Sequence, residues 1–152
     1  MSKLFDAAAI AVLERQIDEW LAHIRVQNLA IVAIDRGDGD EKRWYVRLRG
    51  EEKEFTTIWL TLGQRTLRYE TYVMPAPEEN AVALYESLLR RNEKLIGAHF
   101  AIGVEDAVFL RGEIFLTAMT ESELDRIIGT LYAGVEQCFN PLLRIGFASK
   151  FA

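Results

Sequence analysis

The 152-residue sequence has little of several residue types, and each scarcity excludes a class of protein. Its single cysteine, Cys138, allows no internal disulfide and no zinc site built from several thiolates. Its 18 Lys and Arg stand against 23 Asp and Glu, and the net charge of −5 argues against a bulk electrostatic grip on nucleic acid or anionic membrane. It has no targeting segment and no apolar run of about 18 residues, so we expect a cytoplasmic protein without a membrane span.

Catalytic and metal-binding motifs are missing as well. The two histidines, His23 and His99, have no cysteine or carboxylate at ligand spacing. Cys138 follows the apolar stripe of a predicted helix, which is typical of a small packed side chain and not of a nucleophile. The acids of the segment 35–40 lack the spacing of a calcium loop, and no glycine-rich phosphate loop is present. We therefore expect no enzyme activity, no catalytic residues, no metal and no cofactor.

The composition is that of an ordinary globular protein, with 50% apolar and 27% charged residues. The length fits one domain, residues 1–152, which would bury about 70% of the surface that its unfolded chain exposes.

Helical periodicity appears in three regions. Asp6 can cap a helix that reaches about Arg25, with an apolar face of Ile10, Leu13, Ile17, Trp20, Leu21 and Ile24. Pro75-Ala76-Pro77 opens a second helix that Gly97 ends, with an apolar face of Ala81, Tyr85, Leu88 and Leu89. Thr120 and Glu123 form a capping-box pattern for a third helix, and Asn140-Pro141 indicates the start of a short fourth. The stripe of the third helix is Leu124, Ile127, Ile128, Leu131, Tyr132 and Val135.

Strand patterns fill the space between these helices. Four strands are predicted before the second helix, at Leu29–Asp35, Arg43–Arg49, Phe55–Leu62 and Arg65–Met74. Two follow it, one with alternating Phe100, Ile102 and Val104 and a long one over Ala107–Met119. Short connections make neighbouring strands antiparallel. The order α-β-β-β-β-α-β-β-α-α predicts an α+β fold, an antiparallel sheet with helices packed on one face.

Alternation divides the central strands into two faces. The face toward the helices carries Trp44, Val46, Leu48, Ile58, Leu60, Leu62, Leu67 and Tyr69, and the other carries Tyr45, Arg47, Phe55, Thr57, Trp59, Thr61, Arg68, Glu70 and Tyr72. Aromatics, arginines and threonines match the composition of protein-binding surfaces. Ordinary cross-strand pairing on a solvent-exposed sheet face explains these residue types too. A third interpretation is that the aromatic rings stack on the bases of RNA, but the sequence lacks the glycine and aromatic motif of RNA-binding sheets. Our hypothesis for a protein-binding site is Tyr45, Arg47, Trp59, Arg68 and Tyr72.

Several short runs together resemble one family. They are Arg43–Gly50, Met74–Pro77, Leu88–Asn92 and Glu123–Arg126, and their order and spacing resemble the YbjN family in an actinobacterial form, over about Arg43 to Phe147. The resemblance implies the fold of type III secretion chaperones, compact α+β domains that often form homodimers and bind extended segments of a protein client. It brings no agreed enzymatic activity and no catalytic residues, and fold alone does not fix function.

These observations favour a non-enzymatic regulator or chaperone-like domain that binds a protein or peptide, in stress response or signalling. The alternative is a small-molecule-sensing or catalytic domain that uses a cleft between sheet and helices. We also expect a homodimer, because Ala101 and Gly103 are small enough to let another element approach closely. In the core, we expect nearly inaccessible side chains at Trp20, Trp44, Leu60, Leu88, Ile127 and Leu131.

Overall fold

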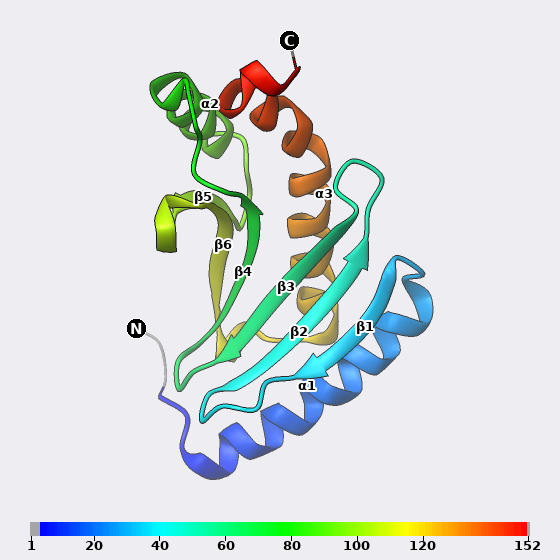
Figure 1. Ribbon diagram of the computed structural model, residues 1–152. Coiled ribbons are helices and arrows are strands. Elements are labelled where there is room, and N and C mark those ends of the chain that lie inside the picture. The colour runs from blue at the N-terminus through cyan, green and yellow to red at the C-terminus, as the bar shows by residue number, and fades with distance from the viewer. Residues whose placement is uncertain (1–3, 152) are drawn as a thin grey trace.

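The computed structural model describes residues 4–151 and has three helices and a six-stranded antiparallel sheet (Figure 1). The chain begins with α1 (Ala7–Gln27) and then forms β1 (Ile31–Arg36), β2 (Lys42–Arg49), β3 (Phe55–Leu62) and β4 (Thr66–Met74). It continues through α2 (Ala81–Asn92), β5 (His99–Ile102), β6 (Val108–Phe115) and α3 (Glu121–Gly146). A 3-10 turn at Ala148–Phe151 is the last helical element, so the predicted α+β order is confirmed.

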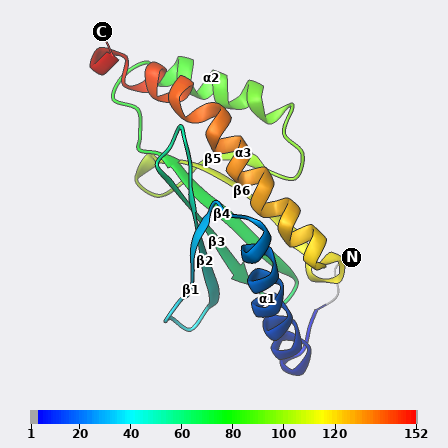
Figure 2. The same ribbon diagram turned by 90° about the vertical axis from the view of Figure 1, so that its right-hand side faces the viewer.

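The sheet has the strand order β1-β2-β3-β4-β6-β5, and every neighbouring pair is antiparallel. Helices α1 and α3 lie on the same side of this sheet, and α2 packs against α3 and β5 (Figure 2). Among the described residues, no helix lies on the other side of β2, β3 and β4, as predicted. Within residues 4–151, no helix combines the length and apolar character needed to cross a membrane.

The core lies between the sheet and the helices. All eight side chains predicted to face the helices are buried, and so are the predicted core residues Trp44, Leu60, Leu88, Ile127 and Leu131. The prediction for Trp20 was wrong, because this side chain is only half-buried. It stands at the flank of the α1 stripe, whose fully packed members are Ile10, Leu13, Ile17, Leu21 and Ile24.

The boundaries and face of α2 differ from the prediction. The helix starts at Ala81, four residues after Pro77, because the backbone N–H groups of Glu78 and Glu79 donate to the Gly146 carbonyl at 2.9 and 3.1 Å. These bonds hold the bend at Glu78 and Glu79 against the end of α3. The buried residues of α2 are Leu84 and Leu88, whereas Leu89 is 70% exposed, so the predicted face was rotated.

The capping residues at the two long helices behave as predicted. The Asp6 carboxylate accepts from the Ala9 N–H at 2.8 Å, and the Thr120 hydroxyl accepts from the Glu123 N–H at 3.1 Å. The boundary at Asn140-Pro141 was wrong, because α3 runs through Pro141 to Gly146. Both sides of the proline are anchored by buried side chains, Cys138 before it and Leu142 after it.

Three strand boundaries differ from the prediction by more than one residue. Leu29 lies in a turn, because Asn28 accepts hydrogen bonds from the Ala30 and Ile31 N–H groups, and β1 therefore starts at Ile31. β5 ends at Ile102, and Val104 is 73% exposed in the 3-10 turn that follows. β6 ends at Phe115, because its partner strand β4 begins opposite it at Thr66 and offers no further backbone hydrogen bonds.

Candidate functional site

The five residues of the predicted binding site lie on the face of the sheet that carries no helix. The register forms rows across the strands, and one row pairs Tyr45 with Trp59, Trp59 with Glu70, and Glu70 with Arg111. A second row pairs Arg43 with Thr61, Thr61 with Arg68, and Arg68 with Glu113. Arg47 pairs with Thr57 on the same face, and Tyr72 pairs with Phe109. The outward face assigned to these residues by alternation is therefore the one that they occupy in the structure.

On β2 and β3, arginines and aromatic rings alternate in space. We call Arg43, Tyr45, Arg47, Arg49, Phe55 and Trp59 the arginine–aromatic ladder. The Tyr45 and Trp59 rings meet edge to face with centroids 5.9 Å apart. The guanidinium carbon of Arg47 lies 3.9 Å from the Phe55 centroid, and that of Arg49 lies 5.0 Å from it. The Arg43 guanidinium lies 5.4 Å from the Trp59 centroid. These cation–π contacts hold the guanidinium groups against the aromatic rings of the ladder.

The two halves of this face differ in charge compensation. On the β4–β6 half, Arg68 pairs with Glu113 at 3.9 Å and Arg111 pairs with Glu70 at 3.1 Å. On the ladder, Arg47 and Arg49 have no carboxylate within ion-pair distance among residues 4–151. Their donors are open to an external acceptor, whereas Arg68 already has a partner in the chain.

Tyr72 lies apart from the ladder. Its ring is 41% exposed and contacts Phe109 edge to face, with centroids 5.7 Å apart. Phe109 is 4% exposed although it is on the outward face, because Gly103 and the turn after it cover the ring. A Cβ at Gly103 would collide with this ring, so the small size of Gly103 serves a contact within the chain.

The tip of the β2–β3 hairpin is fastened to α3. Three α3 residues four apart, Tyr132, Glu136 and Asn140, each bind it. The Glu136 carboxylate accepts from the backbone N–H groups of residues 51, 52 and 53 at 2.6–3.3 Å. The Tyr132 hydroxyl donates to the Arg49 carbonyl at 2.8 Å, and the Asn140 amide donates to the Glu52 carboxylate at 2.6 Å. These bonds fix the end of the ladder.

Lys53 links this tip to the strand beside the ladder. Its ammonium group donates to the carbonyls of Tyr72 and Val73 at 2.7 and 3.2 Å. It also lies 5.1 Å from the Tyr72 ring centroid and 5.5 Å from that of Phe139. Burial lowers the pKa of Lys53 to about 8.

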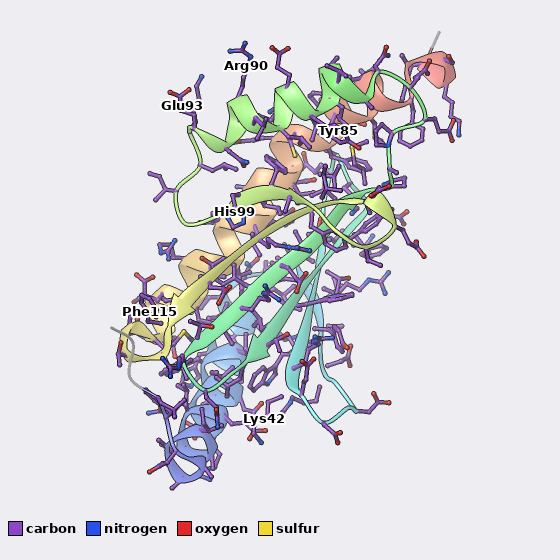
Figure 3. All side chains as sticks on the ribbon, turned by 90° about the vertical axis from the view of Figure 1, so that its left-hand side faces the viewer. Lys42, Tyr85, Arg90, Glu93, His99 and Phe115 are labelled. Atoms are coloured by element: carbon purple, nitrogen blue, oxygen red, sulfur yellow. The ribbon has the colours of Figure 1, made fainter. Side chains whose placement is uncertain are left out.

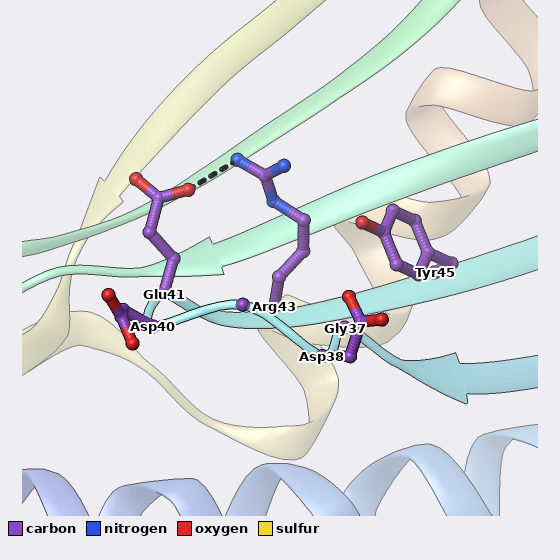
Figure 4. Close-up of a pocket in the computed structure, with 7 residues that line it drawn as sticks. Gly37, Asp38, Asp40, Glu41, Arg43 and Tyr45 are labelled. Atoms are coloured by element: carbon purple, nitrogen blue, oxygen red, sulfur yellow. Dashed lines mark hydrogen bonds and ion pairs between the residues drawn. The ribbon is translucent and has the colours of Figure 1, made fainter.

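A hollow of ≈ 280 Å³ lies beside Arg43 and Tyr45, at the loop between β1 and β2 (Figure 4). Its rim carries Asp38, Asp40 and Glu41, and the Glu41 carboxylate pairs with Arg43 at 2.8 Å. In the part of the chain that the structure describes, no three His, Cys, Asp or Glu side chains gather to hold a metal ion. The β1–β2 loop therefore places acidic side chains next to the Arg43 end of the ladder.

The two histidines and the cysteine lie on three different elements, α1, β5 and α3. The structure brings the Glu121 carboxylate to the His23 Nδ1 at 2.9 Å, a pair that sequence spacing could not show because 98 residues separate them. Both side chains are exposed, and the pair joins the surfaces of α1 and α3. His99 is exposed on β5. Cys138 is 1% exposed, and burial raises the pKa of its thiol to about 11, which suits a packed neutral side chain.

Period-two alternation placed Arg43 and Arg49 on the same face as Tyr45 and Arg47, and it placed Phe55 on the outward face of the next strand. Sequence reasoning assigned none of these three residues to the site. The stacking of Arg47 and Arg49 on Phe55 depends on the pairing of Arg49 with Phe55 across the hairpin, which only the register reveals.

Comparison with known proteins gives both a family and a fold. The model of the YbjN family, described as "Putative bacterial sensory transduction regulator", matches residues 15–144. The uncharacterised protein Rv0487 of Mycobacterium tuberculosis is 32% identical over 127 residues, which cover 84% of this chain and 69% of that protein. The uncharacterised protein ML2442 of Mycobacterium leprae is 33% identical over 108 residues, which cover 71% of this chain and 59% of that protein.

Two solved structures share the architecture. A chain of the ExsC–ExsE complex aligns with a TM-score of 0.61 and 17% identity, over 86% of this chain and 96% of that one. A chain of the heterodimeric ExoU–SpcU complex, from the type III secretion system of Pseudomonas aeruginosa, aligns with a TM-score of 0.55 and 17% identity, over 83% and 96%. The fold is thus that of type III secretion chaperones, as the sequence resemblance implied. By the match over residues 15–144, the chain belongs to the YbjN family.

Proposed function

We propose that this protein is a non-enzymatic, chaperone-like regulator that binds an extended segment of another protein on its arginine–aromatic ladder. In this proposal the chain acts as one domain in the cytoplasm, in a signalling or stress-response setting. The observation that carries the proposal is the pair of unpaired guanidinium groups, Arg47 and Arg49, stacked on Phe55 beside the Tyr45–Trp59 pair.

The chemistry of the ladder selects an acidic or carbonyl-rich segment. A planar guanidinium offers several donors to a carboxylate or a peptide carbonyl, and here it is held in place by the ring beneath it. Trp59 and Tyr45 offer apolar area between the arginines for a side chain of the partner. The neighbouring proteins of this fold are complexes of two proteins, which supports a binding role without assigning the partner here.

The non-enzymatic part of the proposal is supported by the surroundings of the candidate groups. Cys138 is buried and its thiol has a raised pKa, whereas the exposed His23 pairs with Glu121 on the helix side. Neither residue belongs to a pair of nucleophile and general base, which nucleophilic catalysis needs.

Capture from native lysate with matched variants tests this function. Trp59→Ala and Arg47→Glu change outward-facing side chains, so both variants should fold as the parent does and lose the captured partner. Arg15→Glu is the control, because Arg15 is exposed on α1, on the helix side of the sheet and away from the ladder. If both ladder variants fold and recover the same partner as the parent, the ladder is not the binding surface.

We further propose a homodimer that forms through α2 and the edge strand β5. A groove of ≈ 280 Å³ with an almost wholly apolar lining lies between them, and Leu89 and Ile102 at its rim are 70% and 50% exposed. Val82 on the same helix is 83% exposed. Glu86 and Arg90 lie one turn apart, so an antiparallel second copy would place each glutamate near the partner's arginine. This charge pattern favours a second copy as the occupant.

A further inference from the structure

A second cleft lies between α2 and α3 and shares Phe100 with the apolar groove. It has a volume of ≈ 180 Å³. Arg91 and Lys94 stand on its α2 side, and Gly134, Gln137 and Cys138 stand on its α3 side. It is separate from the arginine–aromatic ladder, because its lining comes from α2, α3, β5 and the segment between α2 and β5, whereas the ladder lies on β2 and β3.

Arg91 is the unusual residue of this cleft. Three arginines are half-buried in the described chain, and two of them have carboxylate partners, Arg43 with Glu41 and Arg111 with Glu70. Arg91 has none within ion-pair distance among residues 4–151, and its one side-chain hydrogen bond runs from Nε to the Ser87 hydroxyl at 3.4 Å. A partly buried cation without a counter-charge is costly, so such a group usually has a ligand or a partner. Lys94 adds a second positive charge to the same cleft.

Apart from the polar amide of Gln137, the remaining lining is apolar, and none of it is charged. Leu95 and Phe100 form the wall opposite α3, and Phe100 is 7% exposed. Gly134 contributes no side chain, and the Cys138 thiol at the base stays neutral at ordinary pH, because burial raises its pKa to about 11. A bound anion would therefore meet two cations and no negative group among the lining residues.

We propose that this cleft binds a small organic carboxylate, with the carboxylate on Arg91 and Lys94 and a short apolar chain against Leu95 and Phe100. The volume sets the size of the ligand. A water molecule takes about 30 Å³ in the liquid, so the cleft holds about six groups of that size, which fits a carboxylate with a chain of a few carbons. This proposal stands apart from client binding, and neither depends on the other.

The test is a titration of the full-length protein with butanoate, followed by the amide shifts in two-dimensional ¹H–¹⁵N NMR. We expect saturable shifts centred on Arg91, Lys94, Phe100 and Cys138, and weaker binding of acetate, because its methyl group contacts less of the apolar wall. Inorganic phosphate is the third probe, and it should bind more weakly than butanoate since it gains nothing from that wall.

Paired glutamine variants separate the cleft from general surface charge. Arg91→Gln should weaken butanoate binding by about tenfold or more, because it removes the charge and keeps an amide donor. Arg15→Gln should leave it unchanged, because Arg15 is exposed on α1, outside both the cleft and the proposed dimer face, where Arg90 projects outward from α2 (Figure 3). The absence of saturable shifts at these amides up to about 10 mM butanoate would overturn the proposal. So would phosphate binding as tightly as butanoate, or an equal effect of the two variants.

Discussion

Leu131 shows how strongly a single side chain on α3 contributes to stability. It is completely buried in the core between α3 and the sheet. Leu131→Ala should lower the free energy of unfolding by about 2–5 kcal/mol, because it removes buried apolar area and leaves a cavity. The denaturant midpoint measures this loss. Val26→Ala is the control, since Val26 is 79% exposed and its truncation should change the stability by less than about 0.5 kcal/mol. Equal midpoints for both variants would contradict the assigned face of α3.

Lys53 makes stability depend on pH in a defined direction. Its pKa falls from 10.5 to about 8 on folding, so between these values the unfolded chain binds more protons than the native chain. The free energy of unfolding therefore rises with pH through this interval. Relative to Lys53→Met, which cannot titrate, the parent should gain stability from pH about 8 to about 10.5. Denaturant unfolding of both proteins across that range measures the difference between their free energies of unfolding. The titration of the tyrosines and acids is common to both proteins and cancels in this difference. A constant or falling difference would contradict the burial of this ammonium group.

At the residue scale, strand alternation predicted more than helix periodicity did. All the side chains assigned to the helix side of β2, β3 and β4 are buried, because a period of two leaves only two choices and the apolar run decides between them. On α2, apolar residues occur on two sides, and periodicity alone could not say that Leu84 packs inward while Leu89 points outward. That choice depends on where α3 and β5 lie.

The β2–β3 hairpin is an element whose position depends on α3. Glu136 accepts from three consecutive backbone N–H groups at its tip. Glu136→Ala should lower the free energy of unfolding by about 1–2 kcal/mol, since these charge-assisted bonds are lost and water replaces them in part. Denaturant unfolding measures this loss.

Glu136→Gln and Glu19→Ala complete this experiment. The glutamine keeps the shape and one acceptor oxygen, and should lose less than the alanine. Glu19 is exposed on α1, so its replacement should cost less than about 0.5 kcal/mol. If Glu136→Ala is as stable as Glu19→Ala, the contact with the hairpin tip does not stabilise the fold.

Element order was predictable, whereas several boundaries depend on distant residues. α2 starts late because residues 78 and 79 bond to Gly146, which lies 67 residues beyond Glu79. α3 continues through Pro141 because buried side chains on both sides of it pack against the core, which outweighs the hydrogen bond that a proline removes. Local sequence signals such as Asn-Pro or Pro-x-Pro carry no information about these contacts.

The candidate site was also predictable in part. The shared outward face of Tyr45, Arg47, Trp59, Arg68 and Tyr72 followed from alternation, whereas the pairing of individual residues came from the structure. The pairing of Arg68 with Glu113 did not, because the strand that lies next to β4 is β6, and the sequence does not say which of β5 and β6 takes that place. The unpaired state of Arg47 and Arg49 is likewise a property of the assembled sheet.

For the whole molecule, the proposed homodimer gives a direct prediction of mass. Light scattering should give twice the 17.4 kDa of one chain for the parent. Leu89→Asp should give the single-chain mass, because it places a charge in the apolar groove between α2 and β5. Val26→Asp, at an equally exposed position on α1, should remain dimeric. A monomeric parent at micromolar concentration would contradict the dimer, and a dimeric Leu89→Asp variant would place the interface elsewhere.

The central claim is that a partner protein binds on the helix-free face of the sheet, and site-specific photocrosslinking in cells tests it most directly. Thr57 lies beside Arg47 on this face, and p-benzoylphenylalanine at this position should give a light-dependent adduct with the partner. The same crosslinker at Val12, which is 47% exposed on α1, should give none. An adduct at Thr57 alone is the predicted result; an adduct at Val12 but not at Thr57, in cells where the parent captures its partner, would contradict the account.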